Sequence, residues 1–329
     1  MISHFFTAPL FAFGRAAMKY IDFHCDTITE IHDHREKGNL LENSLYIDLK
    51  KLKKGGCFIQ DFALWVDREK DTDVWGRYEN LLSTWKKEAA LYKDRLQPIH
   101  SREDIREAEE DGKIGALLSI EGGEVVGGSV EKLRQVYKDG VRLMTLTWNY
   151  PNEIGWPNGM EGKDKGITAR GWEIVEAMES LHMVVDTSHL NDEGTRDILL
   201  HCRRAPMASH SDARAVTAHQ RNLPDDLIRL FGEKGGLIGL NFANHFTGIS
   251  EKTKLENIVR HARHIRNVGG IDVLALGSDF DGIEPKLELK DASEMGRLAD
   301  ALKAGGFHEE EVEKIFWQNG EQYLKDILG

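Results

Sequence analysis

Short apolar runs, many of them rich in β-branched residues, recur along the chain and alternate with longer amphipathic stretches. Runs of this length are typical of buried strands, and the helical spacing of apolar residues between them is typical of helices that cover a sheet. We expect eight strands, at residues 20–24, 58–64, 114–120, 143–147, 183–186, 207–209, 237–241 and 273–277. We expect the helices at residues 75–92, 102–110, 130–138, 169–181, 192–201, 225–233, 252–267, 293–304 and 309–327.

This order of elements predicts the fold class. A strand followed by a helix, repeated around the chain, is the pattern of an α/β protein with a (β/α)8 TIM barrel. The alternative is an open doubly wound sheet, which would carry a glycine-rich phosphate turn after its first strand. The chain has His24-Cys25-Asp26-Thr27 at that place, so the barrel is favoured.

A single barrel domain is expected over residues 19–329, because no low-complexity linker or charge run marks a boundary. Residues 1–18 are expected to be an N-terminal leader or extension. They contain an apolar stretch, but Arg15 follows that stretch, whereas a secretion signal carries its positive charge before it.

The charge balance narrows the possible partners. The chain has 43 Lys and Arg residues against 55 Asp and Glu residues, which gives a net charge of −12. This balance argues against binding a nucleic-acid backbone or an anionic membrane surface, both of which need clustered basic residues. The three cysteines, Cys25, Cys57 and Cys202, are odd in number and form no CxxC pair. We therefore expect no disulfide framework and a cytoplasmic location.

Metal-binding side chains follow five of the predicted strands. Barrels of this class carry their active sites at the C-terminal ends of the strands. The residues at those ends are His24, Asp26, Glu121, His189, His210 and Asp279. Taken singly, each is explained by a hydrogen bond to a loop or by a helix cap. Together, three imidazoles and three carboxylates at one mouth would be costly to bury without cations, and two divalent ions sharing a carboxylate would satisfy them.

Two further histidines, His261 and His264, lie one helical turn apart on a predicted helix. This spacing can bind a metal, but the helix precedes the last strand and is expected on the outside of the barrel. We therefore expect these two side chains to lie on a solvated helix face.

The motifs at the strand ends resemble those of the membrane (renal-type) dipeptidase family. The likeness runs from about residue 19 to the C-terminus, and the motifs stand in the family's order. They are Asp22-Phe23-His24-Cys25-Asp26-Thr27, Glu121-Gly122-Gly123, Leu146-Thr147-Trp148-Asn149, Ser188-His189, Ser209-His210-Ser211 and Asp279-Phe280-Asp281-Gly282. The chain looks like a microbial, soluble member, and the resemblance implies a metal-dependent hydrolase barrel with two zinc ions (Zn²⁺).

The resemblance also implies a role for each ligand residue. His24 and Asp26 would ligate one zinc ion, and His189 and His210 would ligate the other. Glu121, together with a water or hydroxide, would bridge the two ions.

The remaining site residues would handle the proton and the substrate. Asp279 would be the catalytic acid–base residue, and Arg221 would hold the terminal carboxylate of the substrate. Trp148 and Asn149 are expected to contact the substrate. Trp148 stands where the membrane-bound animal members have a histidine. An indole can donate a hydrogen bond but cannot accept a proton, so substrate preference is expected to differ.

The sequence thus predicts a zinc-dependent metallo-dipeptidase. Its substrates would include dipeptides with a C-terminal D-residue, and a metal-bridging hydroxide would attack the peptide bond. The expected partner is a small dipeptide, with no nucleic acid and no membrane. If the chain forms an oligomer, a homodimer is expected.

Two other classes stay open. One is another binuclear-metal barrel amidohydrolase acting on amides or lactones; such enzymes often carry His-x-His on the first strand, where this chain has His24-Cys25-Asp26. The other is a non-catalytic metal-binding barrel, which would be expected to have lost a ligand, and none is missing.

Overall fold

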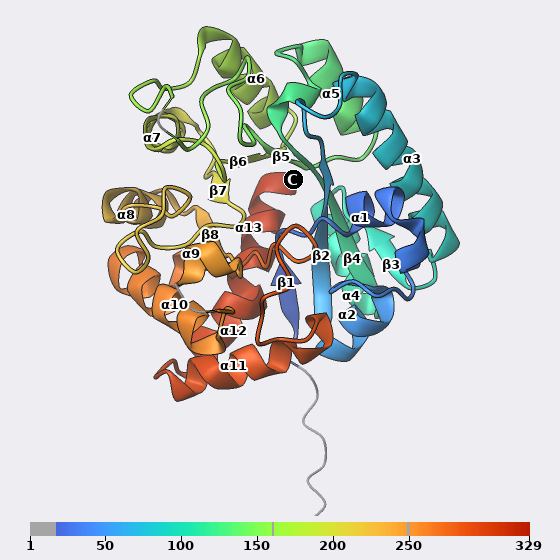
Figure 1. Cartoon of the computed structure of the whole chain (residues 1–329), viewed down its shortest axis with the longest axis vertical. Helices are drawn as coiled ribbons and strands as arrows, with labels where there is room; N and C mark the ends of the chain where they lie inside the picture. Colours follow the sequence, from blue (N-terminus) through green and yellow to red (C-terminus); the bar gives the residue numbers. More distant parts are fainter. Residues whose placement is uncertain (1–17, 160, 249–250) are drawn as a thin grey trace, which may run out of the picture.

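Eight parallel strands close into a barrel with helices around it (Figure 1). The computed structural model describes residues 18–159, 161–248 and 251–329. The barrel strands are β1 (Tyr20–Asp22), β2 (Cys57–Trp65), β4 (Ile114–Glu121), β5 (Leu143–Thr145), β6 (Val184–Asp186), β7 (Met207–Ala208), β8 (Leu237–Leu240) and β9 (Leu274–Leu276). β1 pairs with both β2 and β9, which closes the sheet. The predicted barrel is confirmed and the open-sheet alternative is wrong. The predicted leader lies outside the described residues, apart from Met18.

Most helices lie where the apolar period predicted them. These are α3 (Val74–Leu91), α4 (Arg102–Glu110), α5 (Val130–Lys138), α6 (Ala169–Ser180), α7 (Asp192–His201), α8 (Asp225–Lys234), α10 (Leu255–Gly269) and α11 (Met295–Ala304). The last predicted helix is divided into α12 (Glu309–Glu313), a π-helical turn (Lys314–Gln318) and α13 (Asn319–Leu328). The prediction missed α1 (Thr27–Asp33), α2 (Leu49–Gly55), α9 (Asn244–Thr247) and the strand β3 (Leu96–Pro98), because each is too short to show a period.

The starts of six helices are set by local chemistry. A side-chain oxygen just before the helix accepts a hydrogen bond from a backbone N–H of the first turn, which otherwise has no partner. The capping residues are Asp48, Asp73, Ser101, Ser129, Thr168 and Asn191. These caps explain why boundaries such as that of α4 agree with the predicted ones.

Several strands end earlier than predicted. β1 ends at Asp22, two residues before His24. β7 likewise ends at Ala208, two residues before His210. The polar residues that follow these strands leave the ladder and form the mouth of the barrel, so His24 and His210 stand on loops, whereas Glu121 is the last residue of β4.

The interior of the barrel changes from apolar to polar along the strands. Near their N-terminal ends, Ile59, Leu117, Leu143 and Val184 belong to one apolar cluster with Tyr323, Leu324 and Ile327 of α13, and α13 crosses the centre of the barrel in Figure 1. Two residues further on, the same four strands carry Asp61, Ser119, Thr145 and Asp186, all buried. Side chains two apart share a face of a strand, so the apolar floor and the polar layer are stacked. The polar side chains inside the barrel therefore lie towards its C-terminal mouth.

Gly277 is expected to be essential for this packing. A Cβ atom at Gly277 would lie 1.7 Å from the backbone oxygen of Ser209, and one at Gly239 would lie 1.9 Å from the same atom. Because backbone cannot move aside cheaply, Gly277→Ala should destabilise the fold by about 3 kcal/mol or more, measured as a lower denaturant midpoint. Gly296→Ala is the matched control, since a Cβ there meets nothing within 4 Å in α11. Equal stability of the two variants would contradict the expectation.

One expectation for the outer helices is wrong. His261 is fully buried: its Nδ1 accepts a hydrogen bond from the backbone N–H of Ala213 (3.1 Å), and its Nε2 lies 3.2 Å from the backbone oxygen of Thr247. Only His264 is partly exposed, and it pairs with Asp225 (2.7 Å). The segment after β7 covers this side of α10, which a helical period cannot show.

The cysteines and the helices bear on two smaller expectations. Cys25, Cys57 and Cys202 are all buried and unpaired, so the expected absence of a disulfide framework is confirmed. In the part of the chain that the structure describes, no helix has the length and apolar character needed to cross a membrane.

Candidate active site

Six predicted residues meet at the C-terminal mouth of the barrel. His24 and Asp26 follow β1, Glu121 ends β4, His189 follows β6, His210 follows β7 and Asp279 follows β9. None of the six is more than 9% exposed. Four of them, Asp26, Glu121, His189 and Asp279, line a cavity of about 540 Å³ whose walls also include Trp148 and Asn149. Strands that are far apart in the sequence therefore bring these side chains to one place.

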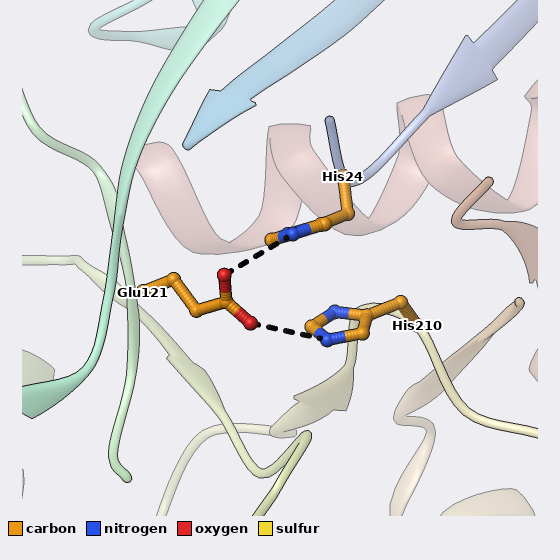
Figure 2. A group of neighbouring side chains, drawn as sticks. All are labelled: His24, Glu121 and His210. Carbon is orange, nitrogen blue, oxygen red and sulfur yellow. Dashed lines mark ion pairs between the residues drawn. The ribbon is translucent and has the colours of Figure 1, made fainter. Parts of the chain in front are cut away.

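Glu121 lies at the centre of this group, with its two oxygens facing different sides (Figure 2). Its Oε1 is 2.9 Å from Nε2 of His189 and 3.5 Å from Nε2 of His210. Its Oε2 is 3.5 Å from Nε2 of His24. A carboxylate that offers one oxygen to each of two clusters has the geometry of a bridging ligand.

His24 belongs to two groups of potential ligand atoms. In one group it lies with Glu121 and His210, and the ligand atoms are within 4.8 Å of one another. In the other it lies with Asp26 and Asp279, at 3.3 and 3.9 Å from their nearest oxygens. The structure thus brings Asp279 as close to the candidate ligand atoms as a ligand would be.

Several of these atoms are buried without a hydrogen bond. They are Nδ1 and Nε2 of His24, Nε2 of His210 and Oδ1 of Asp26. Buried polar atoms are nearly always paired, and imidazole nitrogens and carboxylate oxygens are the usual ligands of a divalent ion such as zinc. The donor set therefore fits one or more cations.

The pKa values of the acidic groups point the same way. Burial, together with the charges of Asp26 and Glu121, raises the pKa of Asp279 to about 7. Burial also raises the pKa of Asp26. Although burial opposes it, the charge of His24 and the close contact of the His189 imidazole hold the pKa of Glu121 well below its usual value. Crowded carboxylates of this kind are stabilised by positive charge placed between them.

The imidazoles are not equivalent. Burial disfavours a charge on His24, yet the carboxylates of Glu121 and Asp26 hold its pKa well above the usual value. Burial and the charge of Arg221 lower the pKa of His189 to about 4. Burial and the charge of His24 hold the pKa of His210 well below its usual value. The lowered pKa values favour the neutral imidazole in His189 and His210, which is the form that binds a metal.

Two site residues have an unusual backbone. His189 and Asp279 have φ values of 68° and 62°, in the left-handed region that favours glycine. Such conformations cost free energy and persist where the surrounding structure requires them, often at functional sites. The surrounding structure therefore holds both residues in this conformation at the cavity wall.

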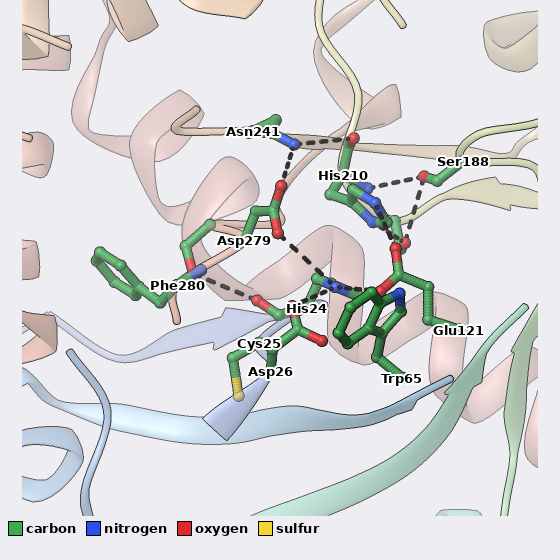
Figure 3. A network of polar contacts seen from close by, with 12 residues as sticks. His24, Cys25, Asp26, Trp65, Glu121, Ser188, His210, Asn241, Asp279 and Phe280 are labelled. Atoms are coloured by element: carbon green, nitrogen blue, oxygen red, sulfur yellow. Dashed lines mark hydrogen bonds and ion pairs between the residues drawn. The ribbon is translucent and has the colours of Figure 1, made fainter. Parts of the chain in front are cut away.

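Asn241 is a site residue that the sequence reasoning missed. Its Nδ2 donates to Oδ2 of Asp279 (2.9 Å) and to the backbone oxygen of His210 (3.3 Å; Figure 3). Its own Oδ1 accepts from the backbone N–H of Ala243 (2.6 Å), which fixes the amide orientation. Asn241 therefore holds one oxygen of Asp279 and leaves Oδ1 facing the cluster. Its position at the end of a predicted strand was the available signal.

The predicted substrate contacts occupy the wall of the cavity. Trp148 and Asn149 line it, and Oδ1 of Asn149 is 3.0 Å from Nδ1 of His189, so Asn149 also orients that ring. The ring of Trp148 packs edge-on against Trp65, with centroids 5.0 Å apart. Trp65 ends β2, lines the same cavity and has a buried indole N–H without a hydrogen bond. The sequence reasoning did not find Trp65, because an aromatic residue at a strand end is ordinary.

Arg221 lies at the edge of the site. It is 6% exposed, and its Nε and Nη1 make no hydrogen bond. Its Nη2 donates to the backbone oxygen of His210 (3.4 Å), and its guanidinium is 5.3 Å from the ring of Phe246, which lines the cavity. A buried guanidinium with unpaired donors is suited to binding an anion.

Comparisons with known proteins agree with this geometry. The family model described as membrane dipeptidase (peptidase family M19) matches residues 15–327. An uncharacterized protein in the pqqA 5′ region of Klebsiella pneumoniae is 34% identical over 244 residues, which cover 71% of this chain and 89% of that protein. Dipeptidase tcpJ of Claviceps purpurea is 29% identical over 294 residues, which cover 86% of this chain and 69% of that protein.

Solved structures show the same fold. The crystal structure of the dipeptidase AC, a metallopeptidase of family M19, has a TM-score of 0.88 at 24% identity and covers 95% of this chain and 100% of that one. A metallopeptidase from Rhodobacter sphaeroides, solved with a phosphinate mimic of the dipeptide L-Ala-D-Ala, has a TM-score of 0.87 at 23% identity with the same coverage.

Proposed function

The chain belongs to the membrane dipeptidase family, peptidase family M19, and is a metallo-dipeptidase; from this premise we propose that it cleaves dipeptides with two zinc ions bound at the barrel mouth. The observation that carries the number of ions is the placement of Glu121, whose Oε1 faces His189 and His210 while Oε2 faces His24. The nitrogen and carboxylate donors are those that zinc prefers.

In this proposal, each ion has its own ligands. His24 and Asp26 would hold one ion, His189 and His210 would hold the other, and Glu121 would be shared between them. Two zinc ions held there would supply a water of lowered pKa as the nucleophile, and a Lewis acid for the peptide carbonyl.

Asp279 is the proposed proton carrier. Its Oδ2 is held by Asn241, while its Oδ1 lies 3.9 Å from Nε2 of His24, at the edge of the ligand cluster. Oδ1 can accept a proton from the attacking water and pass it to the leaving amine. The support for this role is its position in the cavity wall together with its family motif.

Arg221 is proposed to select short substrates. A guanidinium that binds the C-terminal carboxylate beside the metal cluster leaves room for one residue after the cleaved bond, so peptides with more residues on that side are excluded. We include dipeptides with a C-terminal D-residue, because the similar Rhodobacter sphaeroides protein was solved with a mimic of L-Ala-D-Ala. We place the enzyme in the cytoplasm, since its three cysteines are buried thiols.

Hydrolysis of a peptide panel tests the proposal. The panel contains L,L- and L,D-dipeptides, a tripeptide and a lactone, and the metal content of the purified protein is measured alongside. We expect cleavage of dipeptides only, with two zinc ions per chain. Lactone hydrolysis without dipeptide cleavage, at full metal content, would favour another amidohydrolase activity.

Arg221→Met should raise KM by about 10²-fold with a much smaller change in kcat. The reason is that truncating one partner of a buried, hydrogen-bonded charge pair costs about 2–5 kcal/mol, and the pair of Arg221 with the substrate carboxylate would form in both ground and transition states. Steady-state kinetics with a dipeptide and its C-terminal amide provide the measurement. The wild type should prefer the acid, and the variant should not.

Arg229→Met is the control, because Arg229 is exposed on the neighbouring α8. An Arg221→Met enzyme that still prefers the acid would exclude Arg221 as the carboxylate-binding residue.

A further inference from the structure

A buried carboxylate lies in the polar layer below the metal-binding side chains and has no role in the proposed mechanism. Asp186 ends β6 and is fully buried. Its Oδ1 accepts hydrogen bonds from the backbone N–H groups of Ser188 (3.0 Å) and Ser209 (2.8 Å). Its Oδ2 accepts from the hydroxyls of Thr145 (2.6 Å) and Ser209 (2.7 Å). The carboxylate is thus surrounded by donors.

The Ser209 hydroxyl links this carboxylate to a candidate metal ligand. Its Oγ lies 2.7 Å from Oδ2 of Asp186 and 2.7 Å from Nδ1 of His210. A hydroxyl has one hydrogen, and a carboxylate can only accept. If that hydrogen pointed to His210, two oxygen lone pairs would face each other at 2.7 Å. The hydrogen therefore points to Asp186, and Ser209 Oγ accepts a hydrogen bond from Nδ1 of His210.

This assignment fixes the tautomer of His210. In a neutral imidazole, one nitrogen carries the hydrogen and the other carries a free lone pair. With the hydrogen on Nδ1, the lone pair is on Nε2, which is buried, makes no hydrogen bond and lies 3.5 Å from Oε1 of Glu121. The backbone N–H of His210 is also held, by the hydroxyl of Ser188 (3.0 Å; Figure 3).

We propose that Asp186 is a positioning residue that acts through the Ser209 hydroxyl to hold His210 in the metal-binding tautomer and orientation. The proposal rests on the proposed function, because His210 is taken as a metal ligand. Partners of this kind behind a ligating histidine typically contribute about 10–100-fold to metal affinity.

The three histidines of the site differ in this respect. Nδ1 of His24 makes no hydrogen bond, and Nδ1 of His189 lies 3.0 Å from a side-chain oxygen of the cavity wall, that of Asn149. His210 alone among these three is linked to a buried carboxylate. Loss of the Asp186 carboxylate should therefore weaken the binding of the ion on the His210 side and leave the binding of the other ion largely unaffected.

Asp186→Asn gives the sharpest test, because it reverses the direction of the chain of hydrogen bonds. The amide oxygen would stay with the two backbone N–H groups, so the NH₂ group would face Ser209. Ser209 would then accept from the amide and donate to Nδ1 of His210, which moves the imidazole hydrogen to Nε2 and removes the lone pair from the metal side. Ser209→Ala should have a smaller effect, because it removes the preference for a hydrogen on Nδ1 of His210 without favouring the other tautomer.

Asp61→Asn is the matched control. Asp61 is equally buried in the same polar layer and accepts a hydrogen bond from Ser119 (2.6 Å), and burial holds its pKa well above the usual value. No hydrogen bond joins it to His210 among the interactions of the described residues. An amide there replaces a carboxyl group without changing the tautomer of His210.

Zinc affinity is measured by calorimetric titration of the metal-free proteins, and the His210 tautomer by nitrogen NMR of histidine-labelled protein. We expect Asp186→Asn to lower the affinity for one of two zinc ions by about 10–100-fold and to place the imidazole hydrogen of His210 on Nε2. Ser209→Ala should lower this affinity less. Asp61→Asn should leave the zinc affinities and the tautomer unchanged. Wild-type affinity and tautomer in Asp186→Asn would overturn the proposal, as would an equal loss in Asp61→Asn. A wild type that binds no zinc pair or cleaves no dipeptide would instead overturn the proposed function.

Discussion

Asp279→Asn is expected to lower kcat for dipeptide hydrolysis by about 10²–10⁴-fold while both zinc ions stay bound. The amide has nearly the same shape and can keep the hydrogen bond from Asn241, but it cannot accept a proton from the attacking water. The measurement is kcat at saturating dipeptide, with metal content determined on the same preparation.

Asp281→Asn is the control for this variant. Asp281 is partly buried, and its φ of 70° is also left-handed, but its oxygens are occupied by the hydroxyl of Thr27 (2.6 Å) and the backbone N–H of Tyr46 (2.7 Å). We expect its kcat to stay within a few-fold of the wild type. Unchanged kcat in Asp279→Asn would exclude the proton-transfer role. Loss of a zinc ion in that variant would show Asp279 to be a ligand, which its distance of 3.9 Å from His24 allows.

Glu121→Gln should abolish activity, with a loss of more than about 10³-fold, and should reduce the bound zinc from two ions to one or none. A glutamine offers one ligand oxygen, whereas the two oxygens of Glu121 face opposite sides of the cluster. Without the proposed bridge, neither ion would be held close to the other, and the activated water would be lost. Zinc titration and single-turnover hydrolysis measure the two effects.

Glu124→Gln serves as the comparison for this second variant. Glu124 is also buried, three residues further on, and burial raises its pKa to about 7, so an amide is a fair substitute for its neutral form. It accepts a hydrogen bond from Asn152 and lies in neither ligand group. If Glu121→Gln retained two zinc ions and measurable turnover, the bridging role would be wrong.

The sequence alone determined the order and type of the main elements. Apolar runs between amphipathic stretches predicted all eight barrel strands, and helix α4 was predicted to the residue. The sequence also determined which ligand residues stand at strand ends, from His24 to Asp279. These features are local: periodicity and capping are encoded within a few neighbouring residues, and a parallel barrel places every strand end at one mouth.

Only the tertiary structure decided which atoms of those residues meet. The division of the two Glu121 oxygens, the hold of Asn241 on Asp279 and the chain from Asp186 through Ser209 to His210 join residues from different strands. His261 shows the same limit. Its place on the helix predicted exposure to solvent, but the segment after β7 covers its side chain. Such contacts depend on closure of the barrel and on the register of strands distant in sequence, which no local pattern encodes.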